Sequence, residues 1–400
     1  MAFYPLFISP YFYINGNVNS RINTMFVNNL PKDKFFPIIL GCKHSSSNDN
    51  IPILRPTYNN LFRLINKLLS KTKFLSFINE LPDTYNFTWR KSAFKQAEQY
   101  IKKRQISYMH SISIPFTSHL LALSLKQQYG LPWIAQFYEP WADNQFRGYC
   151  DYTISKNLKW ERMVAINADI IIHNSLKMCD SWIEKYGDLV AKKIFYLPMP
   201  SDLIIRKRND IRRNNDTKFI ISHIGNLYGK RSAKPFLLAL SSFCLKYPSL
   251  AVRLNVNFVG YMQESDVKLV KDLNLCDIVR IIGSIDQNKC KDYYENSDLF
   301  LVIEGEEQGP LFFPSKVINY MYYDCPIIGI TLKDSVLYDL LISNGHYAFR
   351  HCAIDDMVKY LHDIITGAID ATKFNHDAWK EYSINNVINE YCNLLNDKML

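Results

Sequence analysis

The chain alternates short apolar runs with longer segments in which apolar residues recur every three or four positions. Uninterrupted apolar runs of four to eight residues are typical of strands that are buried on both faces of a parallel sheet. The periodic segments between them predict helices that cover such a sheet. The runs that predict strands are 6–10, 36–40, 106–110, 133–137, 170–173, 194–197, 219–223, 252–259, 279–282, 299–303 and 327–330. The pattern therefore indicates an α/β protein.

A domain boundary is predicted near residue 200. Pro198 and Pro200 interrupt the pattern, and the segment 206–218 is polar and charged, as expected of an exposed linker. A length of 400 residues also exceeds what one hydrophobic core usually organises. The expected parts are an N-terminal domain over 1–200, a C-terminal domain over 201–376 and a last helix within 377–400.

The stretch 299–330 combines a predicted strand, an acidic loop, a helix and a second strand. Glu304 and Glu306 follow the first strand, at the edge where open α/β sheets place their ligands. Pro314 and Ser315 precede the helix, and Ser315 is expected to be its N-cap. A helix N-terminus can bind phosphate, and nearby carboxylates can bind sugar or ribose hydroxyls. An ordinary βαβ crossover with a solvated acidic loop explains the same pattern.

This stretch resembles the donor-binding region of GT-B glycosyltransferases, particularly the family-4-like bacterial enzymes that build surface polysaccharides. Those enzymes carry a proline-serine-lysine turn, a helix that reads roughly K-hydrophobic-x-E-Y-M, and a strand that begins with proline. Here the turn and helix read PSKVINYM from Pro314 to Met321, and the strand begins at Pro326. Three other segments match in the same order: ISPYFYINGNVNSRINTMFVNNL (8–30), LPWIAQFYEPW (131–141) and HIGNLYGKRSAKPFLLAL (223–240).

The resemblance spans nearly the whole chain and implies both a fold and an activity. The implied fold is GT-B, with two Rossmann-like, doubly wound parallel-sheet domains facing a cleft and a C-terminal helix that crosses back to the N-terminal domain. The implied reaction moves a sugar from a nucleotide-diphosphate sugar to a hydroxyl group, with retention of anomeric configuration. The donor would bind the C-terminal domain. The acceptor, a lipid-linked oligosaccharide or another glycan as in O-antigen or capsule synthesis, would bind the N-terminal domain.

Breaking a sugar–diphosphate bond leaves negative charge on the departing nucleotide, and the site must stabilise that charge. A divalent metal held by a D-x-D motif is one solution, but the chain contains no D-x-D sequence. Basic side chains together with helix N–H groups are the other. Arg231 and Lys230 follow Gly225 in the segment that matches the loop opening the second domain, and Lys316 begins the later helix. We therefore predict chemistry without metal or cofactor, with Arg231 and Lys230 at the leaving group and Gly225 and Lys316 at the donor.

The N-terminal domain contributes further candidates. Gly16 lies in the glycine-bearing loop, which in the resembled family lies near the donor phosphates. His110 and Glu139 lie at or just beyond the ends of predicted strands, so each is a candidate to bind an acceptor hydroxyl or transfer its proton. Glu139 stands where the family usually has aspartate before Pro-Trp. The alternative for His110 and for His119 is a structural role, which is commoner for a lone histidine.

Asn319 departs from the family pattern. Many relatives carry two glutamates separated by seven residues, the first near the donor sugar and the second near the ribose. Here Leu311 and Asn319 occupy these places. Asparagine can bind ribose hydroxyls without charge assistance, and Glu304, Glu306 or Glu307 can replace the first carboxylate if the loop folds differently. Two alternatives stay open, a nucleotide-sugar 2-epimerase of the same fold and a non-catalytic nucleotide-sugar-binding paralogue.

Positive charge is concentrated in one segment. The chain carries a net +9, and residues 55–104 hold eleven Lys or Arg against three acidic residues, a net +8. Such concentration indicates a polyanion or an anionic membrane surface as a partner. Residues 58–81 also have the period of an amphipathic helix with a basic stripe. The residues predicted to face a membrane or acceptor are Arg63, Lys67, Lys71 and Lys73. A core-packing helix with a solvated basic face is the alternative, and nucleic acid is not an expected partner.

The remaining features bear on location. No apolar run reaches the ~20 residues that span a bilayer, and the first residues lack the basic region and cleavage site of a signal peptide. The nine cysteines are scattered without a C-x-x-C pair, which fits reduced thiols in the cytosol. We expect a cytoplasmic protein that binds peripherally to the inner face of the cytoplasmic membrane.

Overall fold

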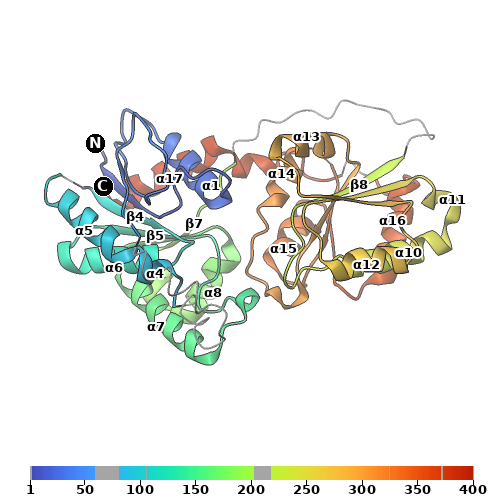
Figure 1. Cartoon of the computed structure of the whole chain (residues 1–400), viewed down its shortest axis with the longest axis horizontal. Helices are drawn as coiled ribbons and strands as arrows, with labels where there is room; N and C mark the ends of the chain where they lie inside the picture. The colour runs from blue at the N-terminus through green and yellow to red at the C-terminus, as the bar shows by residue number, and fades with distance from the viewer. Residues whose placement is uncertain are drawn as a thin grey trace. The chain divides into compact units, whose positions relative to one another are not determined.

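The chain divides into two compact units (Figure 1). The structure, a computed structural model, describes residues 2–58, 81–104, 106–201, 218–323, 325–370 and 373–399. Unit 1 contains Met1–Asp202 and Glu381–Leu400, and unit 2 contains Leu203–Lys380. The sequence pattern placed the corresponding boundaries after residues 200 and 376.

Unit 1 is built on a seven-stranded sheet whose strands pair in parallel. Its strands are β1 (Pro5–Ile8), β2 (Ile38–Leu40), β3 (Ile53–Leu54), β4 (Tyr108–Ile112), β5 (Trp133–Phe137), β6 (Ile170–His173) and β7 (Ile194–Tyr196). Their order is β3-β2-β1-β4-β5-β6-β7, so the chain winds outward in both directions from β1 and β4. Every residue of β1, β4, β5 and β6 is buried, as expected of central strands covered on both faces.

Helices cover both faces of the first sheet. They are α1 (Val18–Asn28), α4 (Tyr85–Thr88), α5 (Arg90–Ile101), α6 (Thr117–Tyr129), α7 (Asp151–Asn167), α8 (Leu176–Tyr186), α9 (Asp188–Ala191) and α17 (Ile384–Met399), with the short 3-10 helices η2 (Gln145–Arg147) and η4 (Ala378–Tyr382), the latter falling at the division between the units. Helices α6 and α8 pack on one face, where His119 and Trp182 meet the ring of Phe137. Helices α1 and α17 lie together on the other face, as Figure 1 shows for the red C-terminal helix. The last helix therefore belongs to the core of unit 1.

Unit 2 is built on a six-stranded parallel sheet. Its strands are β8 (Phe219–Ile224), β9 (Leu254–Val259), β10 (Val279–Gly283), β11 (Leu299–Ile303), β12 (Ile327–Ile330) and β13 (Tyr347–Phe349). Their order is β10-β9-β8-β11-β12-β13. The winding direction reverses between β8 and β11, and the carboxyl ends of two such strands form the usual ligand crevice of an open α/β sheet.

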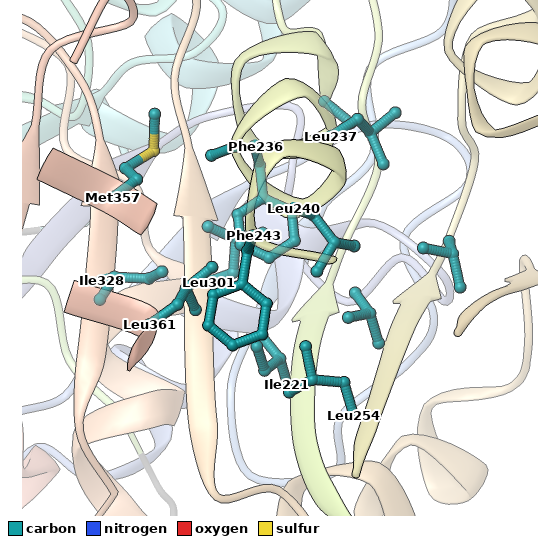
Figure 2. Close-up of a cluster of buried hydrophobic side chains, with 14 of the residues drawn as sticks. Ile221, Phe236, Leu237, Leu240, Phe243, Leu254, Leu301, Ile328, Met357 and Leu361 are labelled. Carbon is teal, nitrogen blue, oxygen red and sulfur yellow. The ribbon is translucent and has the colours of Figure 1, made fainter. Parts of the chain in front are cut away.

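The core of unit 2 lies between this sheet and the helices that cover one of its faces. The helices of the unit are α10 (Lys234–Lys246), α11 (Pro248–Ala251), α12 (Glu264–Asp272), α13 (Gln287–Glu295), η3 (Glu306–Gln308), α14 (Lys316–Tyr322), α15 (Val336–Ser343) and α16 (Ile354–Ile365). Figure 2 shows Phe243 of α10 and Leu361 of α16 against Leu301 of β11. Helices α13 and α14 pack on the opposite face, where Tyr294 and Tyr320 contact the ring of Phe300. Burial of each such large side chain stabilises the fold by about 1.5–3 kcal/mol.

The apolar runs predicted the strands of both central sheets. Four predicted strands have the observed bounds, namely β5, β6, β11 and β12. The pattern missed β3 and β13, which have two and three residues and are too short to form a distinct run. The predicted basic helix over 58–81 and most of the predicted linker over 206–218 lie outside the described residues. Among the helices that the structure describes, none is long and apolar enough to cross a membrane.

Candidate functional site

The loop after β8 is anchored so that Arg231 has a defined position. Asp266, in the first turn of α12, accepts hydrogen bonds from the Ser232 hydroxyl at 2.6 Å and from the Ala233 backbone N–H at 2.8 Å. Gln263, the residue before α12, donates its amide N–H to the Arg231 carbonyl at 2.6 Å. Three hydrogen bonds from one helix start therefore determine the course of the backbone around Arg231.

The Arg231 side chain is held by an amide. Its Nε donates to Gln308 Oε1 at 2.9 Å, and the same oxygen accepts the Gly305 backbone N–H at 3.3 Å. The guanidinium also lies 5.6 Å from the centre of the Tyr228 ring. Gln308 is buried, and its position comes from the 3-10 turn η3 in the loop after β11. The loops after β8 and β11, which flank the switch point of the sheet, are thus joined through Arg231 and Gln308.

Lys316, the first residue of α14, approaches the same edge of the sheet. Its Nζ lies 3.2 Å from Nε2 of His223 in β8, and His223 Nδ1 lies 2.9 Å from the Leu301 carbonyl. Because a carbonyl only accepts, Nδ1 carries the histidine proton and Nε2 accepts a hydrogen bond from the lysine. A Cβ on Gly225, whose φ is +140°, would lie 2.6 Å from the Lys316 Nζ. The glycine therefore makes room for the lysine.

The charges of this group influence one another. Burial, together with the positive charge of Arg231, lowers the pKa of Lys316 to about 7, while Glu304 opposes the shift. Burial, followed by the charge of Lys316, holds the pKa of His223 well below its usual range, so His223 is neutral. Within the described part of the chain, no carboxylate forms an ion pair with Lys316. The lysine charge is therefore not matched by a direct anionic contact.

Glu304 is a buried carboxyl group beside these cations. Its Oε2 accepts a hydrogen bond from the Thr331 hydroxyl at 2.5 Å, and that hydroxyl lies 2.8 Å from the Ser335 hydroxyl. The backbone carbonyl of Glu304 accepts a hydrogen bond from His351 Nε2 at 2.8 Å. Burial raises the pKa of Glu304 to about 7, although Thr331, Arg231 and Lys316 each favour its charged form. Its other carboxyl oxygen, Oε1, is buried and has no hydrogen-bond partner among the described residues. Glu304 thus supplies an acidic group at the carboxyl end of β11.

Two predicted site residues lie at the solvent-exposed side of the candidate site. They are Lys230, in the loop after β8, and Glu306, in the loop after β11. Lys230 Nζ lies 3.2 Å from Glu307 Oε2, and the Glu307 side chain is 78% exposed. Glu306 is also exposed, on the turn η3. Ion pairs at such exposed positions are worth little because water screens them. The structure therefore places Lys230 and Glu306 at the rim and Arg231 and Glu304 further inside.

The start of α14 differs in detail from the prediction. Ser315 is the N-cap residue of the helix, as predicted, but its backbone is helical and its side chain forms no capping hydrogen bond. Pro314 is buried, and its carbonyl accepts the Val317 N–H at 2.9 Å. Asn319 is half-buried and donates its amide N–H to the Tyr294 hydroxyl at 3.1 Å. The amide oxygen of Asn319 remains the group that would accept a ligand hydroxyl.

His110 lies in the core of unit 1. Its Nδ1 lies 2.8 Å from the Tyr391 hydroxyl and its Nε2 lies 2.9 Å from Gln136 Oε1. The rings of Phe7, Phe26 and Tyr391 surround it, and burial lowers its pKa to about 3. Strand β4 continues to Ile112, so His110 lies within the strand rather than at its end. This corrects the predicted catalytic role: with both nitrogens bonded and no exposure to solvent, His110 is a structural residue.

The other candidates of unit 1 lie at loops. Glu139 is half-buried, two residues beyond β5. Gly16 has a φ of +73° in the turn before α1, where a Cβ would meet nothing within 4 Å, and Asn17 caps the helix through the Ser20 N–H. His119 Nδ1 is bonded to the Ser111 hydroxyl at 2.8 Å, as expected for a structural histidine. The candidates Arg63, Lys67, Lys71 and Lys73 lie outside the described residues.

Comparisons with known proteins bear on the fold. No family model and no curated protein sequence match the chain. Solved structures do: Anabaena Alr3699/HepE in complex with UDP and glucose has a TM-score of 0.65 at 11% identity, covering 99% of this chain and 100% of that one. The galactosyltransferase WaaB of the lipopolysaccharide outer core, in its apo form, has a TM-score of 0.63 at 14% identity, covering 99% of each chain. Sucrose-phosphate synthase from Thermosynechococcus elongatus has a TM-score of 0.67 at 13% identity, covering 99% and 98%.

The chain has the GT-B fold. Both units of this GT-B protein align with the matched structures, because the coverage of each chain is nearly complete. The two parallel sheets of seven and six strands agree with the architecture that the sequence predicted. Identities of 11–14% establish the fold only, and a fold of this kind supports many reactions. The chemistry must therefore be argued from the side chains.

Sequence reasoning missed two residues of the GT-B protein's second unit. Gln308 is uncharged and lies in none of the matched segments, and His223 begins the matched segment 223–240 without being singled out there, so neither was predicted as a partner of Arg231 or Lys316. A partial signal existed for His223, because a buried strand ended with a histidine one residue before a glycine-rich loop. Distances were needed to assign both.

Proposed function

We propose that the protein is a glycosyltransferase that moves a sugar from a nucleotide-diphosphate sugar to a hydroxyl acceptor. The observation that carries the proposal is the convergence of Arg231 and Lys316 at the carboxyl ends of β8 and β11, with Lys316 unpaired by any described carboxylate. A diphosphate is the ligand class that matches two adjacent cations. The switch point of an open α/β sheet is where such a ligand binds.

The chemistry requires stabilisation of the departing nucleotide diphosphate. Arg231 is attached to Gln308 through Nε, and its guanidinium group would bind the phosphates. Lys316 adds a second charge from a half-buried position, where the lower dielectric strengthens its effect. Lys230, at the rim, assists the approach of the donor. The chain's own cations thus supply the stabilisation, and we propose that transfer does not require a divalent metal.

Two matched structures support a nucleotide-sugar donor. Alr3699/HepE is described in complexes with UDP and with UDP-glucose, and WaaB is named as a galactosyltransferase of the lipopolysaccharide outer core. By analogy, the acceptor of this protein is a lipid-linked oligosaccharide in O-antigen or capsule synthesis, and the reaction retains anomeric configuration. The concentration of positive charge in residues 55–104 supports peripheral attachment to the cytoplasmic face of the membrane, where such an acceptor would lie.

The proposal is tested first by ligand binding. We expect UDP or another nucleoside diphosphate to raise the unfolding temperature equally in EDTA and in magnesium, because ligands that bind only the folded state stabilise it. A nucleotide sugar that contains the stabilising nucleotide should release its nucleoside diphosphate only when an acceptor glycan is present. Release without any acceptor would support the epimerase alternative. Binding without turnover across the acceptor panel would support the non-catalytic paralogue, and absence of any nucleotide binding would contradict the donor site.

A further inference from the structure

The loop after β5 is packed into unit 1 and presents one accessible side chain. Across residues 133–142, all of which the structure describes, every residue is buried except Glu139, which is half-buried. Trp141 is 1% exposed, and its ring stacks on that of Phe116 with the centroids 4.9 Å apart. The loop therefore belongs to the core of unit 1, and a carboxyl group is the part of it that a ligand can reach.

Three polar contacts hold the backbone of this loop. Asn174 and Asn144 each donate an amide N–H, both at 3.1 Å, to the carbonyl groups of the residues immediately before and after Glu139. Glu161 Oε2 accepts the Ala142 backbone N–H at 2.8 Å. The contacts come from the residue after β6, from the loop itself and from α7. Three segments of unit 1 thus determine the course of the backbone that carries Glu139.

Glu161 is a buried carboxylate that ties the loop to α8. Its side chain is 1% exposed, and its Oε1 lies 2.7 Å from Lys185 Nζ and accepts the Tyr186 hydroxyl at 2.6 Å. Lys185 also meets Asp143, the loop residue after Ala142, at 2.6 Å. One oxygen of Glu161 is therefore bonded to the loop and the other to the helix. A displacement of the loop would leave part of a buried charge without its partner, which is costly.

A binding residue is most effective when its neighbours hold it in one position. Glu139 lies two residues beyond β5, at the edge of the sheet where open α/β proteins bind their ligands, and a carboxylate accepts hydrogen bonds from sugar hydroxyls. We propose that Glu139 binds a hydroxyl group of the acceptor and that Glu161, with Lys185, is the positioning residue that holds the Glu139 loop in place. This inference rests on the proposed function and deepens it on the acceptor side.

The start of β5 offers a matched control. Asp169 Oδ2 accepts the Trp133 backbone N–H at 2.7 Å and forms an ion pair with Lys126 at 2.6 Å. The chemistry is that of Glu161, a carboxylate shared between a lysine and a backbone N–H, but the contact lies at the opposite end of the strand from Glu139. Asp169→Asn therefore disturbs the anchoring of β5 without acting on the loop.

Transfer is measured as release of nucleoside diphosphate from nucleotide sugars of UDP, GDP and ADP, with octyl glucoside, octyl galactoside and octyl mannoside as acceptors. Glu161→Gln preserves the size of the side chain, but an amide has one oxygen and cannot accept hydrogen bonds from both the loop and α8. We expect Glu139→Ala and Glu161→Gln each to lower kcat/KM for the octyl glycoside at least about tenfold, as loss of a hydrogen bond to a charged group does. Asp169→Asn should change it less than about twofold. The Kd of UDP should not change in any of them, because the proposed donor site lies in unit 2.

A double-mutant cycle separates positioning from general damage to the fold. In the Glu139→Ala background, Glu161→Gln should lower kcat/KM less than about twofold, because the group that it positions is gone. Lys185→Arg retains the positive charge and should stay near wild type, whereas Lys185→Met should resemble Glu161→Gln. Thermal unfolding without ligand shows whether each variant folds.

The outcomes distinguish this inference from the proposed function. If wild type transfers sugar to an octyl glycoside and Glu139→Ala does so equally well, the inference is refuted while the proposed function stands. Equal losses from Glu161→Gln with and without Glu139 would show a merely structural role for Glu161 and overturn its positioning role. Wild type that releases no nucleoside diphosphate with any of these acceptors would contradict the proposed function, and the inference with it. Should Glu161→Gln fail to fold, Asn174→Ala enters the same cycle, and the same two results decide.

Discussion

Two histidines in equivalent architectural settings have different roles. His110 lies in β4 and His223 in β8, each in a central strand next to the point where its parallel sheet reverses direction. Both are buried, both are bonded at both ring nitrogens, and burial lowers the pKa of each. The difference lies in one partner. His110 meets a tyrosine and a glutamine, whereas His223 meets the ammonium group of Lys316.

This difference explains why topology alone does not locate a functional site. The ring of His110 is enclosed by aromatic side chains from β1, α1 and α17, so the helix that closes unit 1 fills the space beside the strand. In unit 2, α14 instead brings a half-buried lysine to the loop that contains Gly225. A buried histidine with neutral, enclosed partners is a core residue, whereas one that holds a charged side chain at the carboxyl end of the sheet is a candidate site residue.

Acidification should produce the largest effect, because it acts on several buried histidines together. Burial lowers the folded-state pKa of His110 and His173 to about 3 and that of His346 to about 4, against about 6.5 in an unfolded chain. Between these values the unfolded state binds more protons, so the stability is complete above pH 6.5 and is lost as pH falls toward 3. We expect each group to contribute up to about 1.4 kcal/mol per pH unit, measured by urea unfolding from pH 7.5 to 4.

The variant His110→Leu isolates one contribution. It leaves the Tyr391 hydroxyl and Gln136 without a buried partner, at a cost of about 1–3 kcal/mol at pH 7.5. The deficit relative to wild type should shrink on acidification, because leucine has no proton to bind, and UDP binding by the folded variant should be unchanged. A pH-independent deficit together with weakened UDP binding would contradict the distinction between the two histidines.

Replacement of Arg231 should have the next largest effect and should act on the reaction rather than the fold. Loss of one hydrogen-bond donor to a developing anion typically lowers kcat by about 10²–10³-fold. We therefore expect Arg231→Ala to lower the rate of nucleoside-diphosphate release by about this factor. Lys230→Ala is the matched control, because Lys230 pairs with the exposed Glu307 and should matter little. Equal losses in the two variants would support the predicted catalytic role of Lys230 and place the phosphates near its ion pair with Glu307.

The pH dependence of donor binding should reveal the charge on Lys316. Burial, with the charge of Arg231, sets the pKa of Lys316 near 7 in the free protein, and a bound diphosphate favours the protonated amine and raises that pKa. Binding is therefore strong below pH 7 and weakens above it, by up to about tenfold per pH unit. Ionisation of Glu304 over the same range adds repulsion with the same sign. UDP affinity from pH 6.5 to 9 measures the effect.

Lys316→Arg provides the control for this profile. Arginine stays protonated throughout the range, so its UDP affinity should depend on pH only through Glu304 and be flatter than that of wild type. A wild-type profile as flat as that of the variant would mean that Lys316 does not titrate near neutrality, and the contrast between His110 and His223 would then lose its electrostatic basis.

The sequence predicted the architecture better than the site, for physical reasons. A strand such as 299–303 is recognisable because burial on both faces demands an uninterrupted apolar run, and the observed β11 has the same bounds. Charged candidates such as Arg231 and Lys316 were recognisable because the chemistry of a diphosphate requires them. The roles of Gln308 and His223 depend on distances of about 3 Å between segments far apart in the chain, which no local pattern encodes. His110 was misplaced because its strand continues two residues further than the apolar run suggested.

The smallest expected effect concerns Asn319, at the other end of the first turn of α14 from Lys316. Its amide N–H is bonded to Tyr294, which leaves a neutral oxygen to accept a ribose hydroxyl. A hydrogen bond to a charged acceptor is about 1 kcal/mol stronger than one to a neutral acceptor, so Asn319→Glu should bind UDP about fivefold more tightly. Pyrophosphate has no ribose and should not gain, so the ratio of the two affinities isolates the contact. A gain for neither ligand would place the ribose away from Asn319, whereas a loss for both would mean that the new carboxylate neutralises the cations beside it. That last outcome would test the central contrast most directly, because it would show by substitution that this site is sensitive to a carboxylate added near Lys316.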